Sequence, residues 1–265
     1  MIELILRIIK NKVREMQQNA LDYTEDYLLG GRILLRQPVQ GYRVAIDPIF
    51  LAASLEVHEG DAILDIGAGV GAASLCLAIR VPHCRIVGLE LQRSSMRLAA
   101  ENIALNNLRE RVEILSGDLL QPPPRLAAGT YAHVMTNPPY LEATRVNTAT
   151  NVHKQLSNVE SSVSLEQWAK FCLLMVRPKG TITFIHRADR LAEILSYFSG
   201  KLGDIVVYPL WPSEGKPAKR VLVRGRKNSH GALTLAPGMI LHHSDGKYTP
   251  MAEAILRNAS PLIMI

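Results

Sequence analysis

The chain has 265 residues, of which 48% are hydrophobic and 20% charged, and its formal net charge is +6. These values describe an ordinary globular chain long enough for one large domain, and the basic excess suits a polyanionic partner such as RNA without requiring one. No apolar run is long enough to span a bilayer, so we expect no membrane span. The three cysteines have no CxxC spacing, so we expect neither a disulfide framework nor a zinc site. Such a chain suits a cytoplasmic location.

The first 58 residues precede the regular part of the chain. Residues 1–25 are expected to form an N-terminal extension with a loosely attached amphipathic helix. Glu3 and Arg7 interrupt its apolar stretch, which argues against a signal peptide. Residues 26–58 carry turn signals and alternating polarity, and these predict a small hairpin region.

Residues 59–227 switch repeatedly between the hydrophobic periods of strands and helices. The predicted strands cover 61–67, 84–90, 111–118, 131–137 and 180–187, and the predicted helices cover 71–80, 94–107, 164–176 and 190–202. The spacing of Ser164 and Gln167 is that of a capping box at the start of one of these helices. Two more strands, 204–211 and 220–226, have no helix between them and should form an antiparallel hairpin at one edge of the sheet.

Strands that alternate with helices indicate an α/β fold, with a mostly parallel sheet covered on both faces. We therefore predict a single domain from residue 26 to 265. Its core would be residues 59–227, and residues 228–265 would be a C-terminal decoration of that core.

A glycine-rich turn follows the first strand of this core. It places Asp65, Gly67, Gly69 and Gly71 in a D-x-G-x-G-x-G pattern. Glycines allow a ligand to approach the backbone closely, but a leading acid would repel the pyrophosphate of a dinucleotide and suits instead the ammonium of a methionine moiety. Glu90 ends the next strand, where a carboxylate can bind a ribose diol.

Asp118 ends the third strand, where its carboxylate could bind an adenine amino group. Taken singly, Asp65 and Asp118 fit helix capping or turn chemistry equally well. Taken jointly and in this order, the acids favour a cofactor site over these local roles.

The stretch Asn137, Pro138, Pro139 and Tyr140 ends the fourth strand. Two prolines cannot continue a strand, so they hold a rigid corner. The Asn137 side-chain oxygen and the Pro138 carbonyl could accept hydrogen bonds from a planar exocyclic amine, and Tyr140 offers a flat face for a base. A proline-terminated strand with an incidental asparagine is the competing interpretation, and the preceding glycine turn makes it the weaker one.

Over residues 60 to 227 these motifs resemble the class I S-adenosylmethionine-dependent methyltransferases. The resemblance implies a Rossmann-like sheet of seven strands, mostly parallel with an antiparallel edge hairpin, and S-adenosyl-L-methionine as cofactor. The implied cofactor-binding residues also include Ala68, Leu91, Leu119 and Asn137.

The wider chain is similar to the tRNA (adenine-N6)-methyltransferase family that modifies valine tRNA beside the anticodon. The similarity rests on "LLGGRILLRQPVQGYRVAIDPIFLAAS", "DIGAGVGAASLCLA", "NPPY", "IHRADRL" and "DGKYTPMAEAILR". It implies that Gln37 and Asp47 lie near the cofactor or at the mouth of the site. Two features leave the RNA target open, namely the N-terminal extension and the basic segment after residue 212.

RNA contact is predicted for a basic segment near the C-terminal strands. Period-two alternation would put Arg220, Arg224 and Arg226 on one face of a strand, although a charged edge strand protected from aggregation would look the same. The long polar loop 141–162 is a candidate substrate lid. The predicted RNA contacts are Lys216, Lys219, Arg220, Arg224, Arg226, Lys227 and Arg187.

Three functions therefore remain open from the sequence. The first is methylation of the adenine N6 amine in RNA, most readily in a tRNA near the anticodon. The second is methylation of another planar amine, either guanine in rRNA or a protein glutamine. The third is a non-catalytic RNA-binding protein that retains the fold, against which the intact Asp65, Glu90 and Asn137 argue.

Overall fold

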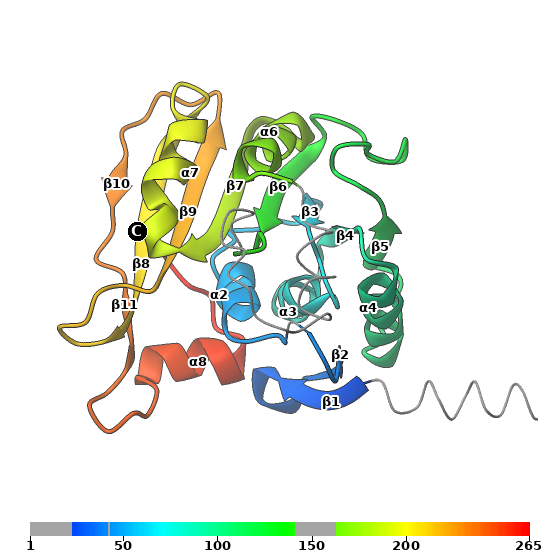
Figure 1. The fold of residues 1–265 in the computed structure, drawn as a ribbon, viewed down its shortest axis with the longest axis horizontal. Coiled ribbons are helices and arrows are strands. Elements are labelled where there is room, and N and C mark those ends of the chain that lie inside the picture. The colour runs from blue at the N-terminus through cyan, green and yellow to red at the C-terminus, as the bar shows by residue number, and fades with distance from the viewer. Residues whose placement is uncertain (1–22, 42, 141–162) are drawn as a thin grey trace, which may run out of the picture.

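The computed structural model describes residues 23–41, 43–140 and 163–265. Most of the predicted N-terminal extension and the predicted 141–162 lid lie outside these residues. A mixed sheet with helices on both faces forms the body of the molecule, and a two-stranded hairpin lies at its lower edge in Figure 1. None of the described helices is long and apolar enough to cross a membrane.

The sheet has nine strands, in the order β10-β8-β9-β7-β6-β3-β4-β5, with β11 also paired to β8. The strands β3 to β7 are mutually parallel, and β9 is antiparallel to both of its neighbours. Their bounds are β3 Ala62–Ile66, β4 Arg85–Glu90, β5 Val112–Ser116, β6 Tyr131–Thr136, β7 Val176–Arg187, β8 Leu202–Ser213, β9 Arg220–Lys227, β10 Thr234–Leu235 and β11 Met239–His242.

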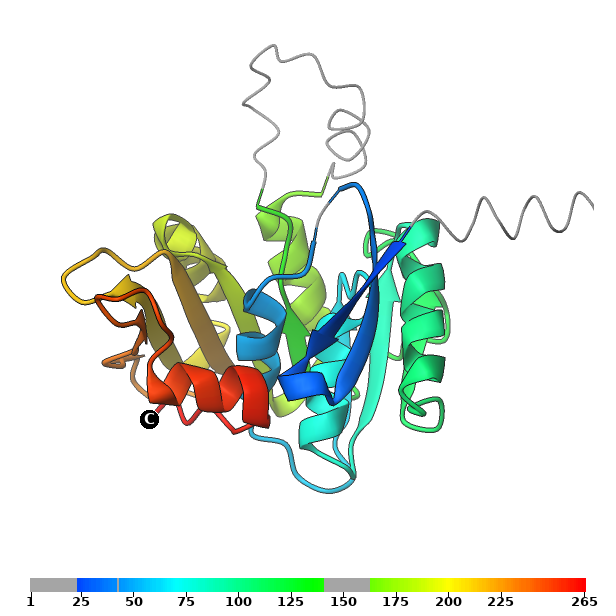
Figure 2. The same cartoon turned by 90° about the horizontal axis from the view of Figure 1, so that it is seen from below.

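Two hydrophobic clusters lie on opposite faces of the sheet. One contains buried residues of α2, α3, α4 and α8, and the other contains buried residues of α6 and α7 (Figure 2). The helices are α2 Asp47–Ala53, α3 Ala72–Arg80, α4 Arg93–Leu105, α6 Leu165–Met175, α7 Leu191–Phe198 and α8 Pro250–Asn258, with short 3-10 turns at Leu29–Gly31 and Ala188–Arg190.

These elements confirm the predicted fold class. The seven expected strands are all present, and the last two pair antiparallel with Leu210 opposite Arg220. Ser164 and Gln167 form the predicted capping box at the start of α6. Beyond the seven strands, β10 and β11 add to the outer side of β8 as parallel strands, so the predicted edge hairpin is covered on that side.

The N-terminal hairpin is shorter than its predicted region. It consists of β1 Tyr23–Leu28 and β2 Ile33–Pro38, whereas residues 47–53 form helix α2. Pro48 lies in the first turn of that helix, where its fixed φ angle favours helix and its missing N–H costs nothing. The helix carries Asp47, a predicted site residue, in its first turn.

Two side-chain amides, one in α4 and one at its C-terminal cap, attach the hairpin to the body. Asn102 donates from Nδ2 to the Arg36 and Val70 carbonyls, both at 3.0 Å, and accepts from the Arg36 N–H at 2.7 Å. One turn later, Asn106 binds both backbone groups of Leu34 in the same way. The two amides therefore pair with the outer edge of β2 as a neighbouring strand would, and satisfy its backbone groups.

Replacing Asn102 by alanine should lower the free energy of unfolding by about 2–3 kcal/mol, because the buried partners of its amide lose their hydrogen bonds. Denaturant unfolding followed by circular dichroism measures this loss. Ser94→Ala, at an exposed position of the same helix, is the matched control and should change little. Equal stability of the two variants would contradict the docking role of Asn102.

Candidate functional site

Three strand ends meet at the carboxyl edge of the sheet. Because Ile66 of β3 pairs with Thr136 of β6 and with Leu89 of β4, the residues that follow them are neighbours. Gly67 and Asn137 thus follow paired positions on adjacent strands, which are spaced about 4.8 Å apart. The glycine turn and the Asn-Pro-Pro-Tyr corner, far apart in sequence, therefore lie side by side.

The glycine turn is held by hydrogen bonds to β4. The N–H groups of Gly67 and Ala68 donate to the Leu89 carbonyl at 2.8 and 3.1 Å, and that of Gly69 donates to Glu90 Oε2 at 2.8 Å. Gly67, Gly69 and Gly71 have φ angles of 72°, 57° and 87°, in the left-handed region that favours glycine. This backbone leads directly into α3, whose first turn follows Gly71.

The turn is packed on one side and open on the other. A Cβ atom at Gly67 would lie 2.8 Å from Trp168 Cζ2, whereas a Cβ atom at Gly69 would have no neighbour within 4 Å. Leu91 and Leu120, which follow the acids Glu90 and Asp118 closely in the sequence, are exposed and add apolar surface. An open glycine turn flanked by acids and leucines fits a cationic cofactor that carries a purine, as S-adenosylmethionine does.

Asp65 is the most buried acid of the site, with 2% of its surface exposed. Ser74 Oγ of α3 donates to Asp65 Oδ2 at 2.7 Å. Burial, followed by repulsion from the Glu90 charge, raises the pKa of Asp65 to about 6, although the Ser74 hydroxyl acts in the opposite direction. A positive group bound beside it would stabilise the charged form, so the site is suited to a cation.

The carboxylates of Glu90 and Asp118 also have backbone partners. Glu90 accepts from the Gly69 and Gln92 N–H groups, so it orders the glycine turn. Asp118 Oδ1 accepts from the Leu120 N–H at 2.8 Å, which is the turn chemistry considered as its alternative role. The roles of both in cofactor binding stay predictions.

The Asn-Pro-Pro-Tyr corner is anchored by its tyrosine. Pro138 is buried, Pro139 is exposed, and the side chains of Asn137 and Tyr140 are half-buried. The Tyr140 hydroxyl lies 2.8 Å from Asn137 Oδ1 and 2.6 Å from Asp47 Oδ2. The last residue of the motif therefore reaches back to the first and fixes the side chain of Asn137.

Asp47 and Arg220 form an ion pair behind this corner. Arg220 Nε donates to Asp47 Oδ2 at 2.8 Å, and the Asp47 side chain is 6% exposed. Burial alone would lower the pKa of the Arg220 guanidinium. The neighbouring Asp47 carboxylate has the larger effect, so the pKa of Arg220 is raised. The structure thus places Asp47 at the tyrosine of the corner, while direct contact with the cofactor stays a prediction.

The Tyr140 ring has neighbours on one face and at its edge. The guanidinium carbon of Arg220 lies 4.7 Å from the ring centroid, a cation–π contact, and the His186 ring meets it at 5.0 Å and 72°. Burial, and then the nearby Arg190 charge, lower the pKa of His186 to about 4, so this imidazole is neutral at pH 7. Any base that stacks on Tyr140 must use the face opposite Arg220.

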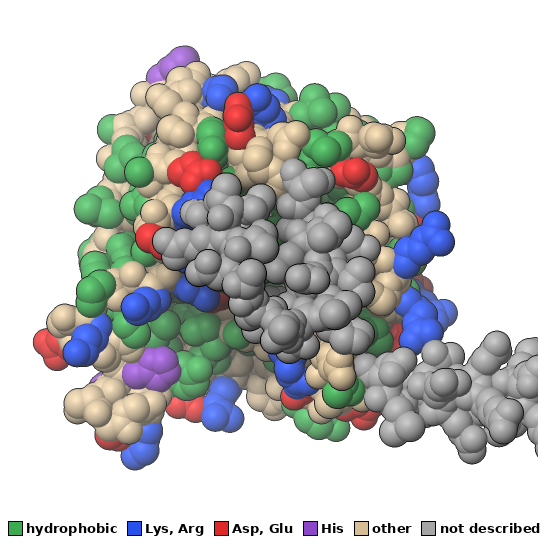
Figure 3. Space-filling model, in the orientation of Figure 1, with side chains coloured by type: hydrophobic (Ala, Val, Ile, Leu, Met, Phe, Trp, Pro, Cys, Tyr) green, Lys and Arg blue, Asp and Glu red, His purple; other side chains and the backbone are tan. Residues whose placement is uncertain are grey.

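Other predicted residues have structural partners. The Gln37 amide, 3% exposed, binds Asp26 Oδ2 and the Val44 N–H within the hairpin region. Arg224 pairs with Glu56, and Lys227 donates to two carbonyls at the end of α6. On the face that Figure 3 shows, basic and acidic side chains are interspersed.

The remaining predicted RNA contacts differ in their surroundings. Arg226 donates to the Lys179 carbonyl, and Arg187 to the Asp189 carboxylate. Lys216 and Lys219 are exposed in the loop between β8 and β9. Arg187 and Arg226 are exposed as well, so exposure alone does not single out one of these four residues.

Trp168, inside the predicted helix 164–176, lies against the glycine turn, a position that the sequence analysis did not predict. Its Nε1 donates to Thr136 Oγ1 at 2.7 Å, and that hydroxyl donates to the Ile66 carbonyl at 2.8 Å. The indole thus ties together the two strand ends that carry Gly67 and Asn137. No local signal identified this role, because its partners are distant in sequence.

Comparison with known proteins agrees with this geometry. The family model "Methyltransferase small domain" matches residues 44–167. The tRNA1(Val) (adenine(37)-N6)-methyltransferase of Porphyromonas gingivalis is 26% identical over 223 residues, which cover 78% of this chain and 84% of the relative. The protein of the same name from Aeromonas hydrophila is 29% identical over 213 residues, with 78% and 85% covered.

Solved structures support the fold. A predicted O-methyltransferase from Agrobacterium tumefaciens superposes with a TM-score of 0.68 at 22% identity, covering 82% of this chain and 98% of that one. Pyrococcus horikoshii TYW2 in complex with MeSAdo superposes with a TM-score of 0.52 at 13% identity, with 78% and 72% covered. The chain is thus an S-adenosylmethionine-dependent methyltransferase with the class I fold, whose residues 44–167 match the methyltransferase small domain, and it is related to proteins named tRNA1(Val) (adenine(37)-N6)-methyltransferase.

Proposed function

We propose that the enzyme methylates the N6 amine of an adenine in RNA, in a tRNA near the anticodon. The observation that carries the proposal is the contact of Tyr140 with Asn137 and Asp47 at a strand end beside the glycine turn. The names of the relatives point to the same base and the same class of RNA. Such a substrate would be met in the cytoplasm.

S-adenosylmethionine, when bound, supplies an electrophilic methyl group. The adenine amine is a poor nucleophile because its lone pair is delocalised into the ring, so the protein has to hold the nitrogen in a geometry that favours attack. Asn137 Oδ1 and the Pro138 carbonyl would accept the two N–H bonds of that amine. Alignment of this kind supplies a large part of a methyl-transfer rate, without a strong base.

The Tyr140 hydroxyl can orient the Asn137 amide. A phenol has one hydrogen, and the charged Asp47 carboxylate at 2.6 Å is a stronger acceptor for it than an amide oxygen. The Asn137 amide can then turn its NH₂ group to the phenol oxygen, which directs its own oxygen away from Tyr140. In that orientation the amide oxygen can accept from a substrate amine, and Arg220 donates to the same Asp47 carboxylate at 2.8 Å.

Nucleoside mass spectrometry of tRNA from a strain that lacks the gene tests the proposal. We expect loss of N6-methyladenosine from one tRNA species and its return when the wild-type gene is supplied. The purified enzyme should restore the mark on that unmodified tRNA in the presence of S-adenosylmethionine. Loss of a methylated guanosine or of a methylated protein glutamine, or an unchanged set of nucleosides, would contradict it.

A further inference from the structure

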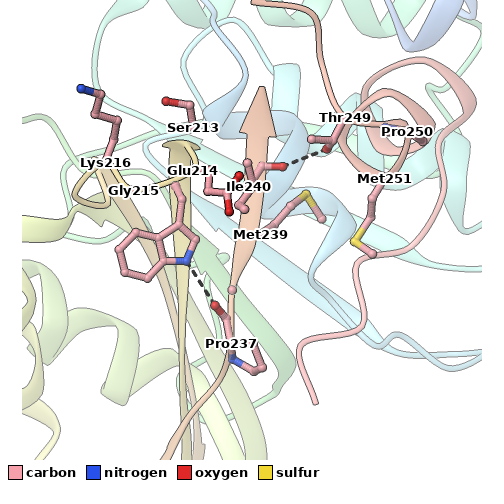
Figure 4. A pocket seen from close by; sticks show the side chains of 12 residues that line it. Ser213, Glu214, Gly215, Lys216, Pro237, Met239, Ile240, Thr249, Pro250 and Met251 are labelled. Carbon is pink, nitrogen blue, oxygen red and sulfur yellow. Dashed lines mark hydrogen bonds between the residues drawn. The ribbon is translucent and has the colours of Figure 1, made fainter. Parts of the chain in front are cut away.

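A pocket of about 620 Å³ lies outside the corner and the glycine turn. Its walls come from the end of β8, the loop that follows, β11 and the start of α8. Figure 4 shows Ser213 and Lys216 on the β8 side, with Thr249, Pro250 and Met251 across the same space. A pocket of this size can accept a small flat ligand or part of a larger one.

The pocket opens at the same edge of the sheet as the corner. β8 is antiparallel to β9, which is antiparallel to β7, so β8 ends on the same side as β6 and β7. Arg220 lies between the two places, because its guanidinium contacts Tyr140 while its Cα pairs with Leu210, the residue before Trp211. This shared neighbour, at one edge of the sheet, is the reason for assigning both places to one RNA chain.

The walls suit a flat heteroaromatic ring. Trp211 Nε1 donates to the Pro237 carbonyl at 3.1 Å, which fixes the orientation of the indole. Gly238 permits this contact, because a Cβ atom there would lie 2.8 Å from Nε1 and 2.3 Å from the Pro209 carbonyl. Ile240 and Met251, 39% and 61% exposed, add apolar surface. A fixed aromatic ring with aliphatic walls is the arrangement on which unpaired bases stack.

Charge at the rim favours a nucleic acid over a neutral ligand. Lys216 and Lys219 are exposed in the loop 214–219, and among the described residues no ion pair joins either to an acid. Lys216 lines the pocket and Lys219 lies in the same loop, so their ammonium groups can bind phosphates of an RNA whose base is inserted. The carboxylate of Glu214, which also lines the pocket, is an acceptor for an exocyclic amine of such a base.

We propose that the Trp211 pocket binds a second, unmethylated nucleobase of the RNA whose adenine enters the corner. This proposal rests on the proposed function, since it requires an RNA substrate. It assigns RNA affinity to Trp211, Ile240, Met251 and the two lysines. Bound there, a neighbouring base would hold the loop open and reduce the cost of extruding the target adenine.

The first test compares binding with turnover. Trp211→Ala should raise the dissociation constant for an unmodified tRNA1(Val) anticodon stem-loop about tenfold, as expected for one lost base stack. The KM for RNA should rise by the same factor, with kcat at saturating RNA and the affinity for S-adenosylmethionine unchanged. Trp211→Phe, which keeps an aromatic ring, should regain most of the RNA affinity. The matched control is Leu235→Ala, because Leu235 is exposed on β10 outside the pocket, and it should bind RNA as wild type does.

A protein–RNA cycle identifies the bound base. A set of anticodon stem-loops is prepared, each with one loop nucleotide replaced by an abasic site. The binding of each RNA to wild type and to Trp211→Ala is then measured. One abasic site should weaken wild-type binding about tenfold and leave Trp211→Ala unaffected, because both changes remove the same contact. Met251→Glu, which changes an exposed side chain and so spares the fold, should weaken RNA binding by repelling phosphates.

The outcomes separate the two proposals. If wild type methylates the RNA, but Trp211→Ala and Met251→Glu bind it as wild type does, the pocket proposal is wrong and the proposed function stands. The pocket proposal is also wrong if, for every abasic site, the loss of binding free energy adds to the loss caused by Trp211→Ala. If wild type neither binds nor methylates any tRNA, the proposed function itself fails.

Discussion

Asn137→Ala is expected to lower kcat at least about a hundredfold while the dissociation constant for S-adenosylmethionine stays within about twofold, as when one aligned transition-state contact is lost. The reason is that Asn137 Oδ1 is proposed to hold the substrate amine, whereas the glycine turn and its acids are proposed to hold the cofactor. Single-turnover methylation of unmodified tRNA and calorimetric titration of the cofactor measure the two quantities separately.

Tyr140→Phe provides the matched comparison. It keeps the ring for stacking but removes the hydroxyl that contacts Asn137 and Asp47. We expect a smaller loss in kcat, about tenfold, since one hydrogen bond to a charged group is removed, with little change in the KM for RNA. Tyr140→Ala should in addition raise that KM. Unchanged turnover in Asn137→Ala would show that Asn137 takes no part in the reaction. If Tyr140→Phe changes KM more than kcat, the hydroxyl does not orient Asn137.

Asp65→Asn is expected to weaken cofactor binding about thirtyfold or more, as when one partner of a buried charge pair is removed. In wild type the pKa of Asp65 is about 6, so binding a cation next to it must displace a proton below that pH. Cofactor affinity should then be constant above pH 7 and fall up to about tenfold per pH unit below pH 6. Asp65→Asn should lose this pH dependence.

The same substitution should stabilise the cofactor-free protein. The folded-state pKa is raised from 3.8 to about 6, so between these values the folded state binds more protons than the unfolded chain. Stability therefore falls as pH rises through this window and stays at its lower value above it, a cost of roughly 3 kcal/mol. Asp65→Asn should recover up to that amount at pH 7 and nothing below pH 4.

Thermal unfolding and calorimetry across pH 4–8 measure both effects of Asp65→Asn. Glu59→Gln, which changes an exposed acid, is the control and should alter neither. A variant that is more stable than wild type yet binds less cofactor would show that Asp65 is kept for function at a cost in stability. Wild-type affinity in Asp65→Asn would contradict contact between this carboxylate and the cofactor.

Much of the fold was predictable because its signals are local. The helix α6 begins where Ser164 and Gln167 form a capping box, and the glycines of the turn mark the end of β3. The absence of a helical segment between residues 211 and 220 indicated the antiparallel pairing of β8 and β9. Each of these features depends on a few neighbouring residues, so the sequence reveals it without knowledge of the rest.

The extent of the sheet and of the hairpin was harder to predict. Residues 47–53 were included in a hairpin region, yet they form α2, which a single proline begins and buried contacts stabilise. β10 has two residues and β11 four, too few for periodicity to be recognised. Such short elements form because β8 already presents an unpaired edge next to them.

The sequence by itself thus determined the order of the seven strands and four helices within residues 59–227, the glycine turn with its acids, and the Asn-Pro-Pro-Tyr corner. Only the tertiary structure decided which partners these residues meet. Asp47 and Arg220 are 173 residues apart, and Trp168 and Thr136 are 32 apart, yet each pair is joined by a hydrogen bond. Periodicity reports which face of an element is buried, whereas the pairing of two distant side chains follows from how the elements pack, and that depends on the whole chain at once.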